Sequence, residues 1–228
     1  MKESLRTEAA RLGITLTEAQ LEQFCTFGEA LIEKNKVMNL TAITEPEAVA
    51  KLHFADCLAL LNCADFQGKR LIDVGCGAGF PGVPLKLGEG SIRLTLLDSL
   101  QKRVNWLKDI LGDMGVEAEC VAARAEEFGH REEFDIATSR AVARLNILAE
   151  LCLPFVKVGG LFLAMKGAAA PEELEEAKSA ISLLGGRLEW VYTYTVDGAE
   201  RYVPLIRKVK PTPPRFPRRF SKIKQQPL

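Results

Sequence analysis

The sequence has few of the residues that build metal centres and disulfide frameworks. It contains two histidines and six cysteines in 228 residues, and no two cysteines form a C-x-x-C pair. Neither histidine has a second ligand at metal-binding spacing, so we expect no bound metal. Scattered cysteines without a secretory leader pattern are typical of reduced thiols. We therefore expect a cytoplasmic protein.

Long apolar runs are also missing. No stretch approaches eighteen uninterrupted apolar residues, which argues against a helix that spans a membrane. Hydrophobic residues still make up 47% of the chain, enough to bury a substantial core. The length fits one catalytic domain with a small addition. We expect a soluble monomer that does not bind membranes.

Acidic residues are absent from one end of the chain. The formal net charge is zero, yet residues 207–228 carry eight Lys or Arg and no Asp or Glu, so the remainder has a net charge of −8. Residues 211–228 also contain five prolines. This composition predicts an extended or partly disordered basic tail that attracts RNA phosphates. The alternative is a solvated terminus without a role.

The first 66 residues favour helices. A capping box at 17–20 precedes apolar residues at helical spacing, and a second box at 44–47 places Pro46 at the first position of another helix. These helices are too small to be stable alone. We expect an N-terminal helical extension, residues 1–66, that packs on the following domain and forms one wall of its site.

Short apolar runs alternate with helical segments in residues 67–210. This rhythm predicts an α/β fold with a mainly parallel sheet covered by helices on both faces. Two last runs, 188–196 and 202–209, are separated by Asp197-Gly198 and predict a hairpin at the end of the sheet. The parallel strands are expected at 71–74, 93–97, 118–122, 134–138 and 161–165.

The first of these strands leads into a turn crowded with glycine. Ten residues beginning at Asp73 read Asp-Val-Gly-Cys-Gly-Ala-Gly-Phe-Pro-Gly. Gly75, Gly77 and Gly79 let backbone amides approach a ligand that a Cβ would block. The carboxylate of Asp73 would repel a pyrophosphate, but it attracts the ammonium and sulfonium of S-adenosylmethionine.

Two other nucleotide sites have similar glycine patterns. Gly77, Gly79 and Gly82 match G-x-G-x-x-G, so an NAD-linked oxidoreductase is the alternative enzyme. A P-loop is excluded because no Gly-Lys-Ser or Gly-Lys-Thr follows. A tight turn without any ligand is the remaining alternative.

Ligands of such sheets lie beyond the carboxyl ends of the strands, so the residues that close each strand are candidates. Asp98 ends the second strand, where its carboxylate can accept from both ribose hydroxyls; alternatively it caps the next helix. Ala125 and Glu126 follow the third strand and are placed to line the adenine. The alternative there is the solvated start of an acidic helix.

Basic residues follow the next two strands. Arg140 closes the fourth strand and Lys166 closes the fifth. Arg144 follows Arg140 closely in the sequence. Cations beside a cationic cofactor indicate an anionic partner, the phosphate backbone of RNA. A surface ion pair is the alternative for Arg144. His53 is expected to pack its helix rather than act as a base.

Together these motifs resemble the bacterial 16S ribosomal RNA (guanine-N7) methyltransferase family, also called glucose-inhibited division protein B. The resemblance implies a Rossmann-like class I methyltransferase fold, S-adenosylmethionine as methyl donor, and a guanine in the decoding region of the small-subunit RNA as substrate. It also implies that Gly75, Phe80, Ala125, Glu126 and Arg140 contact the cofactor. The matching segments are 39–43, 53–56, 73–84, 96–99, 124–128, 139–141 and 165–167.

The implied chemistry agrees with the absence of a candidate base. Guanine N7 has a free lone pair and no proton to remove, so transfer needs alignment more than acid-base help. We expect Arg140, Arg144 and Lys166 to position the substrate by its phosphate or O6. A ribosome-assembly or RNA-binding factor that keeps the fold without catalysis is the alternative from another functional class.

Overall fold

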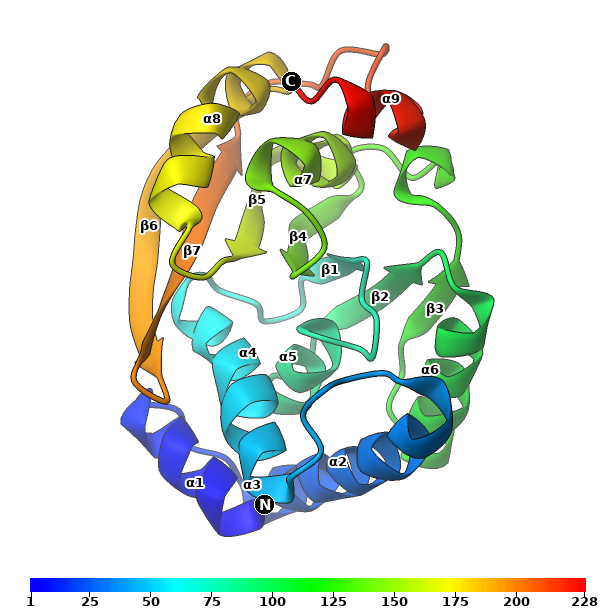
Figure 1. Ribbon diagram of the computed structural model, residues 1–228, viewed down its shortest axis with the longest axis vertical. Coiled ribbons are helices and arrows are strands. Elements are labelled where there is room, and N and C mark those ends of the chain that lie inside the picture. The colour runs from blue at the N-terminus through cyan, green and yellow to red at the C-terminus, as the bar shows by residue number, and fades with distance from the viewer.

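The computed structural model describes residues 1–228, and its centre is a seven-stranded sheet (Figure 1). The strand order is β3-β2-β1-β4-β5-β7-β6, and only β7 runs against the other strands. The strands are β1 (Arg70–Val74), β2 (Arg93–Asp98), β3 (Glu119–Ala122), β4 (Phe134–Arg140), β5 (Val156–Met165), β6 (Gly186–Val196) and β7 (Ala199–Lys208).

The mainly parallel sheet and the final hairpin confirm the predicted fold class. All five expected parallel strands form, although β4 and β5 extend beyond the predicted ranges. The strand order reverses between β1 and β4, which both pair with their neighbours in parallel. In open α/β sheets a ligand lies outside the carboxyl ends of the strands at such a reversal.

Helices cover both faces of the sheet (Figure 1). Alternate strand residues enter two different cores: Leu71 packs with the N-terminal helices, whereas its neighbour Ile72 packs with the later ones. None of the helices combines the length and hydrophobicity needed to cross a bilayer. The first core involves α1 (Lys2–Arg11), α2 (Glu18–Met38), α3 (Pro46–Val49), α4 (Asp56–Leu58), α5 (Gly82–Gly88) and α6 (Gln101–Asp113); the second involves α7 (Leu145–Cys152), α8 (Ala170–Leu183) and α9 (Phe220–Gln225).

The N-terminal helices share one hydrophobic core with the sheet. The predicted capping box is present at Thr17, whose hydroxyl accepts from the Gln20 amide at 3.2 Å. The second predicted box is wrong, because Glu45 occupies the N-cap of α3 and makes no side-chain cap bond, although Pro46 does begin the helix. The helix then widens into a π-helical segment, Ala50–Ala55, a geometry frequent at functional sites.

The expectation of an extended tail is wrong. Residues 211–228 pack against the domain, and Phe216 and Ile223 are 4% and 0% exposed. Arg218 donates to the fully buried carboxylate of Glu150 at 2.6 Å. The local composition did not reveal this docking because the partner of Arg218 lies on α7, 68 residues earlier.

Candidate cofactor and substrate site

The glycine-rich turn joins β1 to α5 at the carboxyl edge of the sheet. Gly75, Gly77 and Gly79 have φ angles of 73°, 56° and 94°, in the left-handed region that glycine adopts without penalty. A Cβ built on Gly77 would meet no protein atom within 4 Å. The backbone at Gly77 therefore borders open space. The amides of residues 75, 76, 77, 79 and 80 already donate within the protein, to Leu97, Asp98 and Cys76.

Asp73 lies beneath this turn and is fully buried. Its Oδ2 accepts from the Gly82 amide at 2.8 Å, which fixes the start of α5, whereas its Oδ1 has no partner. Burial raises the pKa of Asp73 to about 7, against the opposing effect of the Gly82 amide. An unpartnered buried carboxylate oxygen is costly unless a further donor or a bound cation satisfies it.

Two connected cavities lie above the turn. The larger has a volume of about 410 Å³, and its walls include Gly77, Phe80 and Asp98. The smaller, of about 130 Å³, is lined by Ala125 and Glu126, and both cavities reach Gly75 and Asp98. The open space at Gly77, the carboxylate of Asp98 that both cavities share, and the smaller cavity beyond it fit the amino-acid, ribose and adenine parts of S-adenosylmethionine.

The two oxygens of Asp98 already receive backbone amides. Oδ2 accepts from Gly77 and Oδ1 from Leu100, each at 2.9 Å. Leu100 itself is the N-cap of α6, so Asp98 accepts from the cap residue but does not occupy the cap position. Each carboxylate oxygen accepts more than one hydrogen bond, so this arrangement leaves capacity for ribose hydroxyls.

The smaller cavity includes a residue from the C-terminal tail. Phe220 lines it together with Ala125 and Glu126, and the Phe220 amide donates to Glu126 Oε1 at 3.2 Å. The side chain of Glu126 is only 10% exposed, so the alternative of a solvated acidic helix start does not hold. Sequence reasoning missed Phe220 because no local pattern connects the tail with the third strand.

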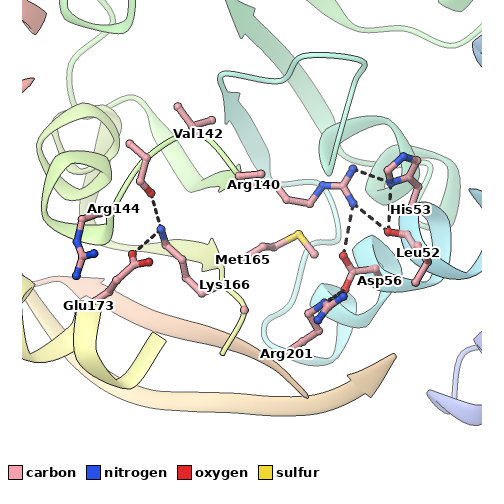
Figure 2. A pocket seen from close by; sticks show the side chains of 13 residues that line it. Leu52, His53, Asp56, Arg140, Val142, Arg144, Met165, Lys166, Glu173 and Arg201 are labelled. Carbon is pink, nitrogen blue, oxygen red and sulfur yellow. Dashed lines mark hydrogen bonds and ion pairs between the residues drawn. The ribbon is translucent and has the colours of Figure 1, made fainter. Parts of the chain in front are cut away.

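Arg140 lines both the 410 Å³ cavity and a third cavity of about 670 Å³. Figure 2 shows it among the residues of the third cavity. Its guanidinium lies over the Phe80 ring, 4.6 Å from the centroid. It donates to the Leu52 carbonyl at 3.3 Å and approaches Asp56 Oδ2 at 3.4 Å. Stacking and two oxygen acceptors therefore hold one arginine at the boundary of the two spaces.

His53 shares this boundary. Arg140 Nη2 lies 3.2 Å from His53 Nδ1, and His53 Nε2 lies 2.8 Å from the hydroxyl of Thr41. Burial, and then the charge of Arg140, lower the pKa of His53 to about 4, so the imidazole is neutral at pH 7. The ring also packs on Phe80 with centroids 4.5 Å apart, in agreement with the expected packing role.

The other two predicted cations line the third cavity as well, but each is already paired. Lys166 is 2.8 Å from Glu173, and both side chains are nearly buried. Arg144 bonds to Glu172 and Glu176 at 3.1 and 2.7 Å, so it does form the ion pair considered as its alternative. These acidic partners on α8 were not anticipated, and they neutralise the two cations.

Three further polar residues of this region were not predicted. Asp56 is 5% exposed, accepts from the Tyr194 hydroxyl at 2.8 Å and lies 3.6 Å from Arg201 Nε. Burial raises the pKa of Asp56, while Arg140, Tyr194 and Arg201 oppose the rise. Because Asp56 and Tyr194 are 138 residues apart, only the folded structure reveals this cluster.

Comparisons with known proteins identify relatives along the whole chain. A family model described as rRNA small subunit methyltransferase G matches residues 20–200. A protein of Pelotomaculum thermopropionicum is 44% identical over 100% of this chain and 99% of its own length. One of Bacillus cytotoxicus is 46% identical, over 95% and 94%. Both are named Ribosomal RNA small subunit methyltransferase G.

Solved structures share the fold at low sequence identity. A SAM-dependent methyltransferase from Aquifex aeolicus is 16% identical with a TM-score of 0.56, covering 77% of this chain and 97% of that one. TrmN from Thermus thermophilus is 19% identical with a TM-score of 0.55, covering 67% and 48%. These similarities confirm the Rossmann-like methyltransferase architecture predicted from the sequence.

Proposed function

The chain belongs to the rRNA small subunit methyltransferase G family, and we propose that it methylates N7 of a guanine in 16S ribosomal RNA with S-adenosylmethionine as donor. One observation carries the proposal: the cavities that fit the donor meet a larger cavity at Arg140 and His53. A base in the larger cavity would therefore lie next to the donor where the two cavities adjoin, so that N7 can meet the methyl group directly.

The chemistry requires alignment of the two reactants. When bound, S-adenosylmethionine supplies a methyl group to the N7 lone pair, so that an N–C bond forms while the C–S bond breaks and sulfur keeps the electron pair. N7 has no proton to lose, and a His53 whose pKa is lowered to about 4 is a weak base, so this histidine and the paired Lys166 fit a site without a general base. In this proposal the chain holds and orients its ligands.

We assign distinct positions to the predicted site residues. The backbone at Gly77 would border the amino-acid part of the donor, the carboxylate of Asp98 would accept from its ribose, and Ala125 with Phe220 would flank the adenine. Arg140 would make the first contact with the nucleotide. Lys166 and Arg144 already face carboxylates, so a phosphate would have to replace those partners.

The docked tail offers a surface for RNA beside the adenine slot. Three of the eight cations in residues 207–228 are engaged with acids: Arg207 with Glu189, Lys208 with Glu132, and Arg218 with Glu150. The other five are exposed and make no ion pair, which suits contacts with phosphates. They are Lys210, Arg215, Arg219, Lys222 and Lys224. We place the small ribosomal subunit against this face, with a monomeric enzyme acting in the cytoplasm.

Methyl transfer to small subunits from a strain that lacks the gene tests the proposal. We expect labelled methyl from S-adenosylmethionine to be recovered as 7-methylguanosine after nucleoside analysis. Arg140→Gln should abolish the transfer, whereas Arg187→Gln on the exposed face of β6 should not. Binding without transfer would instead indicate an assembly factor, and thermal stabilisation by NAD alone would indicate an oxidoreductase.

A further inference from the structure

Asp56 has an unusual position for a carboxylate. It lies in the wall of the 670 Å³ cavity, next to Arg140, which also lines the 410 Å³ cavity (Figure 2). The volume falls in the range of small-molecule sites, which accommodates a nucleoside. With 5% of its surface exposed, Asp56 is already largely desolvated. A donor reaching it from the cavity therefore displaces little water.

The two oxygens of Asp56 differ in their remaining capacity. Oδ1 accepts from the Tyr194 hydroxyl at 2.8 Å and faces Arg201. Oδ2 has only the long 3.4 Å contact with Arg140. Because each carboxylate oxygen accepts about two hydrogen bonds, Oδ2 has room for donors from a ligand. The fixed Oδ1 sets the direction in which Oδ2 points.

The other carboxylate of the cavity wall belongs to Glu173, which is paired with Lys166. Glu173 Oε2 lies 2.8 Å from the Lys166 ammonium and accepts from the Leu145 amide at the same distance. Both of these contacts fall on Oε2, so Oε1 keeps acceptor capacity. The partners follow β5 and begin α7, and Glu173 makes no hydrogen bond or ion pair with Arg140. Asp56 is therefore the carboxylate that combines free acceptor capacity with proximity to Arg140.

We propose that Asp56 accepts from N1–H and the 2-amino group of the substrate guanine while Arg140 donates to O6, so that this pair selects the base. The inference rests on the function proposed above. Guanine places two donors beside O6, whereas adenine presents a lone pair at N1, which a carboxylate repels. N7 lies on the other side of O6 from N1, so this recognition leaves the reacting nitrogen free.

Inosine provides the test, because it lacks only the 2-amino group. Small subunits are reconstituted with guanine or inosine at the methylated position, and kcat/KM is measured for each. The wild type should favour guanine by about 10- to 100-fold, as expected when a site that bonds a donor meets an analogue without it. In Asp56→Asn the preference should fall to near parity.

Glu173→Gln is the matched control, since it removes the other carboxylate of the same cavity. Its preference for guanine should stay at the wild-type ratio whatever its overall rate. A merely structural role of Asp56 would lower both rates and leave the ratio intact, and that result would overturn the proposal. Equal rates of the wild type on guanine and inosine would overturn it as well.

Binding of free nucleotides separates this inference from the proposed function. With S-adenosylhomocysteine present, ligand-observed NMR should show the wild type binding guanosine monophosphate more tightly than inosine monophosphate, and Asp56→Asn binding both alike. This result supports the role of Asp56 even if no subunit is methylated, which would contradict the proposed function alone. Equal binding of both nucleotides by the wild type would contradict the role of Asp56.

Discussion

Removing the exposed charges of the docked tail should weaken RNA binding without unfolding the protein. The variant replaces Arg215, Arg219, Lys222 and Lys224 with glutamine. None of these side chains makes an ion pair, and exposed substitutions usually change stability by about 0.5 kcal/mol or less. Each phosphate contact contributes about 0.7 to 0.9 to the slope of log K against log salt. If each of the four cations contacts one phosphate, the slope should therefore become shallower by about 3.

The measurement is a titration of small-subunit RNA at several salt concentrations, followed by fluorescence anisotropy. A matched control removes four exposed lysines elsewhere, Lys36, Lys102, Lys108 and Lys178, and therefore the same total charge. The control should keep the wild-type slope. An unchanged slope in the tail variant would refute the reasoning, and equal flattening in both variants would show that net charge alone matters.

Three further predictions concern the donor side of the site. The pKa of Asp73 is raised from 3.8 to about 7, so the folded protein keeps a proton that the unfolded chain releases, and stability is lost as pH rises through this interval. Asp73→Asn should remove that loss. In urea unfolding, the free energy of unfolding of the variant minus that of the wild type should increase from pH 4 to 8 by up to about 4 kcal/mol. Parallel pH profiles of the two proteins would contradict this. Asp98→Asn should weaken S-adenosylhomocysteine binding by about 10- to 100-fold in calorimetry, because the amide turns a donor toward the Gly77 amide or the ribose; lost thermal stability with unchanged affinity would favour a purely structural role. Phe220→Ala should weaken the same binding several-fold and leave the RNA salt slope unchanged, because Phe220 lines the cavity proposed for the adenine and carries no charge. Unchanged affinity would remove the tail from the proposed donor site.

The elements of the fold were readable from the sequence because their signals are local. A strand that contains Asp73 and leads into the glycine turn is encoded in about ten consecutive residues, and the alternation of later strands and helices needs only short windows. The docking of the tail could not be predicted, because a segment rich in proline and basic residues has the same composition whether or not it binds a buried partner. Here Glu150 on α7 forms an ion pair with Arg218, and this pair holds the tail against the domain.

The same contrast between local sequence patterns and contacts of distant residues distinguishes the two halves of the site. Residues that border the donor cavities mostly follow strands in a regular order, so the sequence places Gly75, Asp98 and Ala125 together once the sheet is recognised. The substrate cavity instead depends on pairings such as Asp56 with Tyr194 and Lys166 with Glu173, which bring together elements with no shared local pattern.

This division determines which variants can separate the two functions of the site. Arg140 lines both the donor cavity and the substrate cavity, so its loss should disturb both and identify neither. Phe220 lines only the adenine slot and Asp56 only the substrate cavity. If the cavities have the roles proposed here, Phe220→Ala should change donor affinity and keep the preference for guanine, whereas Asp56→Asn should do the reverse. Both effects in one variant would mean that the wall formed by Arg140 couples the two halves.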